Sequence, residues 1–135
     1  MKAMTILGML FLIVAPSWAA DVDSIETEMN ACLAKPESMS TQAMLTCMYA
    51  AQKDYDALLN QTYQRAVAAL DPKSASLLKA AEREWLAFRA SEEAVYDGPW
   101  RADRGTMVLL NLANARVAAL KERITALQVY LPDRN

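Results

Sequence analysis

The chain has 135 residues, a formal net charge of −2, two cysteines and no histidine. The lack of histidine excludes the usual general base, the Ser-His and Cys-His nucleophile pairs and the commonest transition-metal ligand. A zinc site would need an atypical ligand set, so we expect no metal and no cofactor. The acidic balance also argues against nucleic-acid binding, which needs a basic surface.

The first 19 residues have the pattern of a secretory signal peptide. Lys2 supplies a positive start, residues 4–15 are uncharged and apolar, and Ser17-Trp18-Ala19 places small residues at the −3 and −1 positions of a cleavage site. A retained membrane anchor is the alternative, but the apolar run is shorter than the roughly 20 residues that span a bilayer. We expect cleavage after Ala19, only transient membrane contact, and one periplasmic or secreted domain over residues 20–135.

Four helices are predicted in this domain, because the composition is rich in Ala, Leu and Met and poor in Gly. The first is a short helix from Val22 to Lys35, with Asp23 or Ser24 as its N-cap. The second is long, from Thr41 to Leu70, and its apolar face is broad enough to pack against two neighbours. Asp71-Pro72 is expected to end it.

The third helix is predicted from Ser74 to Tyr96, and its charged residues, Glu82 among them, are expected to lie mostly on a solvated face. Its predicted buried stripe consists of Leu77, Leu78, Ala81, Trp85, Phe88 and Val95.

A loop from Asp97 to Gly105 follows, and the last helix is predicted from Thr106 to Leu131. No stretch shows the alternation typical of a β-strand. Short connectors between long amphipathic helices make neighbours antiparallel. The predicted fold is therefore all-α, a small antiparallel bundle of one short N-terminal helix and three long helices with one disulfide.

The two cysteines are expected to form that disulfide. Cys32 lies on the short first helix and Cys47 near the start of the second, and the connector between the helices folds them back on each other. Closing a loop of this size stabilises the fold by roughly 3 kcal/mol in the chain-entropy model. A catalytic pair is the alternative, but the export signal and the absence of a Cys-x-x-Cys spacing disfavour it.

Several short motifs follow one another along the chain: Thr41-Gln42-Ala43-Met44-Leu45-Thr46-Cys47, Asp56, Leu59-Asn60, Tyr63, Glu82-Arg83-Glu84-Trp85-Leu86-Ala87-Phe88-Arg89, Arg123 and Leu127. Taken in order, they resemble the lysozyme inhibitor LprI family of small exported bacterial proteins. The resemblance spans about residues 32–127 and implies a helical exported protein without enzyme chemistry, some of whose relatives inhibit lysozyme. Members often carry a second cysteine pair, and Glu93 and a position near Ala115 occupy those places here.

Five of these residues have two interpretations. Asp56, Asn60 and Tyr63 share one side of the second helix, while Trp85 and Arg89 are one turn apart on the third. In a structural lock, Arg89 pairs with Asp56, Asn60 and Tyr63 complete the hydrogen bonds, and Trp85 covers the pair. The alternative is a ligand site for an anionic group or a sugar, built from Arg89, Trp85 and Asn60.

Three functions remain open. The first is inhibition of a lysozyme-type muramidase by a loop that offers Trp100 with Arg101 and Arg104 to a cleft lined by carboxylates. An ordinary solvated loop is the alternative interpretation of those residues. The second function is an envelope adaptor that binds a protein through a helical face. The third and weakest is an enzyme that uses two carboxylates of the third helix, for which no apolar pocket is apparent.

Overall fold

The computed structural model describes residues 21–132 and confirms the all-α prediction; the predicted signal peptide lies outside the described residues. No helix among residues 21–132 is long and apolar enough to cross a membrane. The elements are α1 (Val22–Leu33), the 3-10 turn η1 (Pro36–Met39), α2 (Thr41–Ala69), α3 (Pro72–Tyr96), the 3-10 turn η2 (Pro99–Arg101) and α4 (Met107–Gln128).

Helix α1 begins at Val22 as predicted, but its N-cap is Asp21 and not Asp23 or Ser24; α3 begins two residues earlier than predicted because Asp71 caps it. Asp21 is the N-cap of α1, and its side chain accepts a hydrogen bond from the backbone N–H of Ser24 at 2.8 Å. Asp71 caps α3 by accepting from the N–H groups of Lys73 and Ser74. Pro72 is therefore the first residue of α3, since its fixed φ suits that position and its missing N–H is not needed there.

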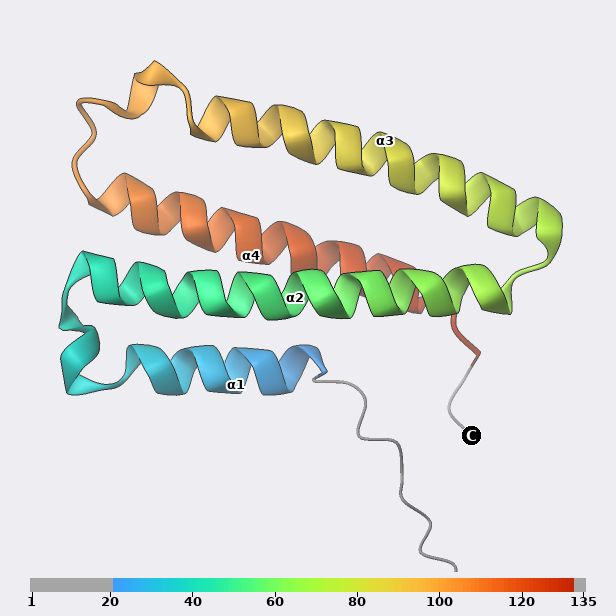
Figure 1. Cartoon of the computed structure of the whole chain (residues 1–135), viewed down its shortest axis with the longest axis horizontal. Coiled ribbons are helices and arrows are strands. Elements are labelled where there is room, and N and C mark those ends of the chain that lie inside the picture. Colours follow the sequence, from blue (N-terminus) through green and yellow to red (C-terminus); the bar gives the residue numbers. More distant parts are fainter. Residues whose placement is uncertain (1–20, 133–135) are drawn as a thin grey trace, which may run out of the picture.

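Helices α1, α2 and α4 form one apolar core. Helix α4 runs alongside α2, and α1 lies against the first half of α2 (Figure 1). Tyr55, Leu120, Ile124 and Leu127 are the largest fully buried side chains, and Ile25 adds α1 to the same cluster. The Tyr55 hydroxyl donates to the carbonyl oxygen of Val22 at 3.2 Å. Leu78 of α3 belongs to the same cluster, so all four helices contribute to one interior that is built mostly from α1, α2 and α4.

The predicted disulfide joins the other end of α1 to α2. Cys32 and Cys47 are bonded, with their Cα atoms 5.8 Å apart, and Cys47 is buried. Ser38 of η1 is also buried, and its hydroxyl donates to the carbonyl oxygen of Cys32 at 2.7 Å. Both ends of the short helix α1 are therefore fixed, one by the bridge and one by the hydrogen bond to Tyr55.

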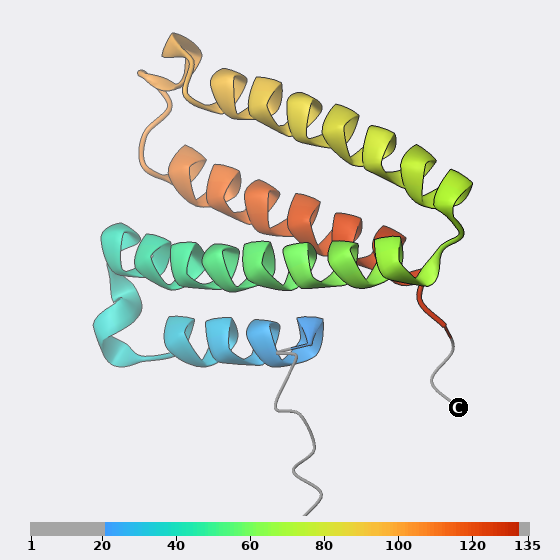
Figure 2. The ribbon, with the colours of Figure 1, turned by 45° about the vertical axis from the view of Figure 1, so that its right-hand side comes forward.

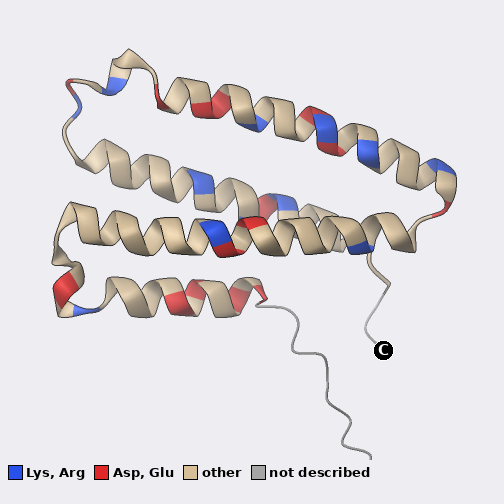
Figure 3. Ribbon diagram, viewed as in Figure 1, with Lys and Arg blue, Asp and Glu red and all other residues tan. Residues whose placement is uncertain are grey.

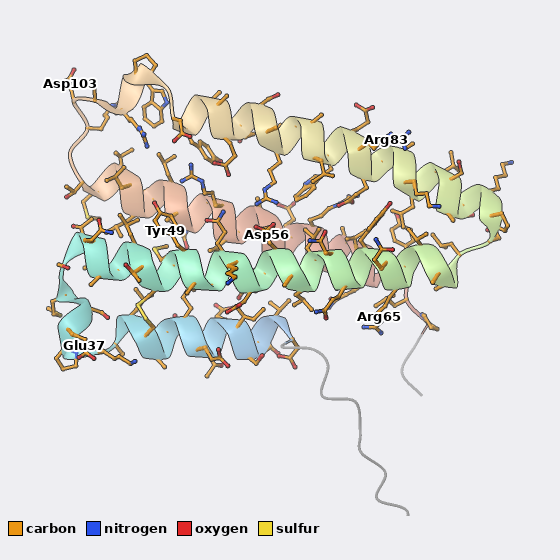
Figure 4. All side chains as sticks on the ribbon, in the orientation of Figure 1. Glu37, Tyr49, Asp56, Arg65, Arg83 and Asp103 are labelled. Atoms are coloured by element: carbon orange, nitrogen blue, oxygen red, sulfur yellow. A yellow bond between two sulfur atoms is a disulfide. The ribbon has the colours of Figure 1, made fainter. Side chains whose placement is uncertain are left out.

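Helix α3 is arranged differently. Its ribbon stands away from α2 and α4 in both views, and long side chains cross the space between them (Figures 1, 2 and 4). The buried stripe predicted for this helix is mostly wrong. Leu78 is buried and Trp85 is half-buried, but Leu77, Ala81, Phe88 and Val95 are exposed.

Glu82, expected on a solvated face, is instead only 5% exposed and points inward. The reason lies on α4, whose arginines face α3 and require carboxylate partners.

Candidate functional site

Three arginine–carboxylate pairs fill the space between α3 and the other helices, and we call them the ionic seam. The pairs are Glu82–Arg123, Arg89–Asp56 and Glu93–Arg116. They join α3 to α4 twice and to α2 once, and Figure 3 shows acidic and basic positions facing one another across this gap. Because ionised groups make the stronger hydrogen bonds, these pairs hold a helix that buries little apolar surface.

The Glu82–Arg123 pair is the most buried of the three. The Arg123 Nε and Nη2 atoms both donate to Glu82 Oε2, at 2.9 and 2.6 Å. The exposed fractions of the two side chains are 17% for Arg123 and 6% for Glu82. Removing one partner would leave a charge buried without compensation.

The Arg89–Asp56 pair has the geometry that the structural-lock interpretation requires. Arg89 Nη1 lies 2.7 Å from Asp56 Oδ1, and Arg89 Nη2 lies 3.2 Å from Asp56 Oδ2, which is a bidentate contact. The carboxylate is nevertheless 40% exposed. The pair therefore orients α3 on α2 more than it contributes buried electrostatic energy.

Trp85 lies between two arginines of the seam. The guanidinium carbon of Arg89 is 5.7 Å from the centre of the Trp85 ring, and that of Arg123 is 5.6 Å away. At the end of α3, the centre of the Tyr96 ring lies 5.2 Å from the guanidinium carbon of Arg116, a residue of α4. Burial, followed by the charge of Glu92, raises the pKa of the Tyr96 hydroxyl, which donates to Glu92. Aromatic faces thus cover the arginines of the seam.

The remaining two residues of the predicted cluster are not part of it. Tyr63 packs against the apolar core, and Asn60 is exposed, with no side-chain hydrogen bond to any residue in 21–132. Asp56, Trp85 and Arg89 come together, whereas Asn60 and Tyr63 do not complete the hydrogen bonds of the Arg89–Asp56 pair.

Glu93, one of the two positions at which the resemblance implies a missing cysteine, accepts a hydrogen bond from Arg116 Nε at 2.7 Å. Arg116 is the residue next to Ala115, the approximate position of the second missing cysteine. An ion pair therefore links α3 and α4 at this level of the bundle.

The loop with the predicted binding residues is an ordered turn. The Trp100 indole N–H donates to the carbonyl oxygen of Val95, and the ring remains 43% exposed. A Cβ on Gly98 would lie 3.0 Å from Trp100 Cδ1 and from the Val95 oxygen, which is tighter than an ordinary van der Waals contact, so glycine suits this close packing. Arg104 lies over the ring at 5.8 Å, and Arg101 pairs with Asp97 at 3.4 Å. The turn presents an anchored aromatic ring beside two cations.

Beside this turn lies a cleft of about 650 Å³, between α2, α4 and the end of α3. Its polar wall on α2 is formed by Tyr49, Gln52, Lys53 and Asp56, whose spacing of three, one and three puts them on one helix face. Asp97, Arg101 and Arg116 line the other sides, with two leucines of α4. Figure 4 labels Tyr49 and Asp56 on α2.

The sequence interpretation missed both this cleft and the buried Glu82–Arg123 pair. The helical spacing of the polar residues from Tyr49 to Asp56 was an available signal for one wall. The opposite wall belongs to residues more than 40 positions away, which no local pattern connects to α2. No group of three or more Cys, Asp and Glu side chains within the described segment is placed to hold a metal ion.

Comparison with known proteins places this architecture in a family. The chain is similar to a protein from Burkholderia thailandensis whose crystal structure is described as that of an uncharacterised protein, with 28% identity and a TM-score of 0.74. The similarity covers 83% of this chain and 54% of the other, so this chain spans about half of that protein. Curated protein sequences give no match.

The sequence profile described as "Lysozyme inhibitor LprI" matches residues 32–127, which is most of the chain. The matched segment contains the disulfide, all three pairs of the ionic seam and the η2 turn. The chain therefore belongs to the lysozyme inhibitor LprI family.

Proposed function

We propose that this protein is a non-enzymatic inhibitor of a lysozyme-type muramidase and that it acts in the periplasm or outside the cell. The observation that carries this proposal is the family match over residues 32–127. LprI proteins are exported binding proteins, and a disulfide suits an oxidising compartment.

The η2 turn is the part of the surface that we propose meets the enzyme. Muramidases of this type cut with paired carboxylates in a cleft, so an inhibitor needs a projecting group that carries cations. Trp100 supplies a half-exposed ring fixed by its hydrogen bond to Val95, and Arg104 lies against that ring. Trp and Arg are enriched among residues that dominate binding energy, and a fixed turn has little entropy to lose on binding.

The ionic seam, by contrast, is proposed as a structural lock. Its carboxylates are engaged by arginines at hydrogen-bond distance, and Trp85 is covered by two of them. These pairs also weaken the enzyme alternative, because Glu82 and Glu93 of α3 are already neutralised by arginines.

The direct test is a turbidity assay in which the oxidised mature protein is titrated into several lysozyme types acting on bacterial cell walls. We expect inhibition at low molar excess, weakened about tenfold or more by Trp100→Ala. Met39→Ala is the matched control, because Met39 is 79% exposed but lies on η1, away from the turn. Absence of inhibition at large molar excess for every lysozyme would contradict the proposed function.

A second candidate is an adaptor that binds a protein through α3. The observation in its favour is the row of exposed apolar side chains on this helix: Leu77, Phe88 and Val95 are 65%, 62% and 57% exposed. Capture of one stoichiometric envelope protein other than a muramidase, lost on Phe88→Ser, would support this function over inhibition.

A further inference from the structure

We propose that the cleft beside the η2 turn binds an Asp or Glu side chain of the partner protein, with Lys53 and Arg101 as the recognising cations. This inference deepens the proposed function: while the turn enters the enzyme's cleft, the adjoining cleft of the inhibitor receives a carboxylate from the rim of that enzyme. The argument rests on charge, accessibility and shape.

The charge balance of the cleft favours an anion. Its carboxylates are already engaged, because Asp56 pairs with Arg89, while Asp97 lies 3.4 Å from Arg101 and 3.8 Å from Arg116. The charged residues that line the cleft, together with their ion-pair partners Arg89 and Glu93, comprise four cations and three carboxylates, and therefore carry one excess positive charge on an otherwise acidic chain. That excess charge is carried by Lys53, which has no ion-pair partner within residues 21–132.

The cations differ in their availability. Arg116 is only 12% exposed and is held by Glu93, so it forms a fixed positive wall. Arg101 is 35% exposed, and its partner Asp97 is 65% exposed and 3.4 Å away, which is a loose contact that a second carboxylate can share or replace. Lys53 is exposed and lines the cleft. An incoming carboxylate thus meets two accessible cations in front of a buried one.

The shape of the cleft suits a side chain on a protein loop. A volume of about 650 Å³ falls within the range of binding clefts, roughly 300–1,000 Å³. Tyr49 is 48% exposed and lines the cleft with Leu109 and Leu112, which gives apolar contact for the methylene groups that carry the carboxylate. Trp100 lies one residue before Arg101, so the proposed anchor and the cleft belong to one continuous surface.

A small probe tests the cleft without any muramidase. The ¹⁵N-labelled protein is titrated with the capped peptide acetyl-Gly-Asp-Gly-amide, and with acetyl-Gly-Asn-Gly-amide as the neutral probe. We expect saturable shifts at the amides of Tyr49, Gln52, Lys53 and Arg101 with the Asp peptide only. Lys53→Gln should weaken the binding about fivefold or more, whereas Lys79→Gln, an exposed lysine on α3, should leave it unchanged. Equal shifts with both peptides, or an unchanged dissociation constant for the Asp peptide in Lys53→Gln, would overturn the site.

A second measurement tests the source of the carboxylate. The dissociation constant for a muramidase that the wild-type protein inhibits should rise about fivefold in Lys53→Gln and stay constant in Lys79→Gln. If the peptide binds but the muramidase affinity does not change, the partner's carboxylate does not occupy the cleft, and the inference is wrong. If no muramidase is bound at all, the proposed function is wrong, and so is the assignment of the muramidase as the partner. The peptide titration still decides whether the cleft binds a carboxylate.

Discussion

The two halves of this bundle are held together by different physics. Helices α1, α2 and α4 share a continuous apolar interior and a disulfide. Helix α3 reaches that interior through Leu78 and the half-buried Trp85, and three arginine–carboxylate pairs hold the rest of its inner side. Burial of apolar surface contributes much to the free energy of folding and has no preferred direction. Ion pairs are directional, and their attraction exceeds the cost of desolvating the charges by little. We infer that the first half sets the stability of the domain and that the seam sets the position of α3.

The largest effect is expected from the apolar half. Leu120 is fully buried between α2 and α4, so Leu120→Ala should lower the free energy of unfolding by about 4 kcal/mol. The measurement is chemical denaturation followed by circular dichroism, and Leu77→Ala is the control because Leu77 is 65% exposed. Equal losses for the two variants would refute the assignment of the core.

In the seam, Arg123→Leu should cost about 3 kcal/mol, because it leaves the Glu82 carboxylate buried without a partner. The double variant Glu82→Leu/Arg123→Leu should recover most of that loss, since an apolar pair of similar volume replaces a buried ion pair at little cost. Denaturation midpoints for the three proteins form the test. A double variant no more stable than Arg123→Leu alone would show that the unpaired Glu82 carboxylate is not the cause of the loss.

Removing the disulfide should cost about 3 kcal/mol, and the loss should be local. In a Cys32→Ser/Cys47→Ser variant, the short helix α1 keeps its contact through Ile25 but loses its tether to α2. Hydrogen exchange should therefore accelerate most in α1 and η1. Uniform acceleration across α3 and α4 would show instead that the bridge supports the whole bundle.

Tyr55 should make the stability of the domain depend on pH. Burial, and then the charges of Glu26 and Asp23, raise the pKa of Tyr55 to about 12 from the ordinary value of 10.0. Because this pKa is raised in the folded state, the contribution of Tyr55 to the free energy of unfolding is complete below pH 10 and is lost as the pH rises through 12. The full contribution is about 2–3 kcal/mol. Tyr55→Phe removes this dependence and also the hydrogen bond to Val22. The difference in stability between the two proteins should therefore shrink as the pH rises from 9 to 12.

The helices, their order and the disulfide were predictable from the sequence because each follows from a local signal: apolar periodicity, Asp and Ser caps, Asp71-Pro72, and two cysteines flanking a short connector. The inward face of α3 was not predictable in the same way. This helix carries two competing stripes, an apolar one through Leu77 and Phe88 and a charged one through Glu82 and Arg89. Choosing between them requires knowing that Arg116 and Arg123 of a distant helix face α3. The cleft has the same cause, since its walls come from segments far apart in the chain.

The smallest loss of stability is expected for Arg89→Ala, and this variant separates the roles of the pairs in the seam. Because the Asp56 carboxylate is 40% exposed, Arg89→Ala leaves it in contact with water, and we expect a loss of only about 1 kcal/mol. The melting temperature should fall by several degrees, and the fall should diminish in high salt, which screens a half-exposed pair. Arg83→Ala, on the solvent side of α3, is the control and should change nothing. An Arg89→Ala loss as large as that of Arg123→Leu would mean that the seam acts as one cooperative unit. A loss confined to Arg123→Leu would assign the stability that the seam contributes to the buried Glu82–Arg123 pair. Arg89 would then serve to fix the position of α3.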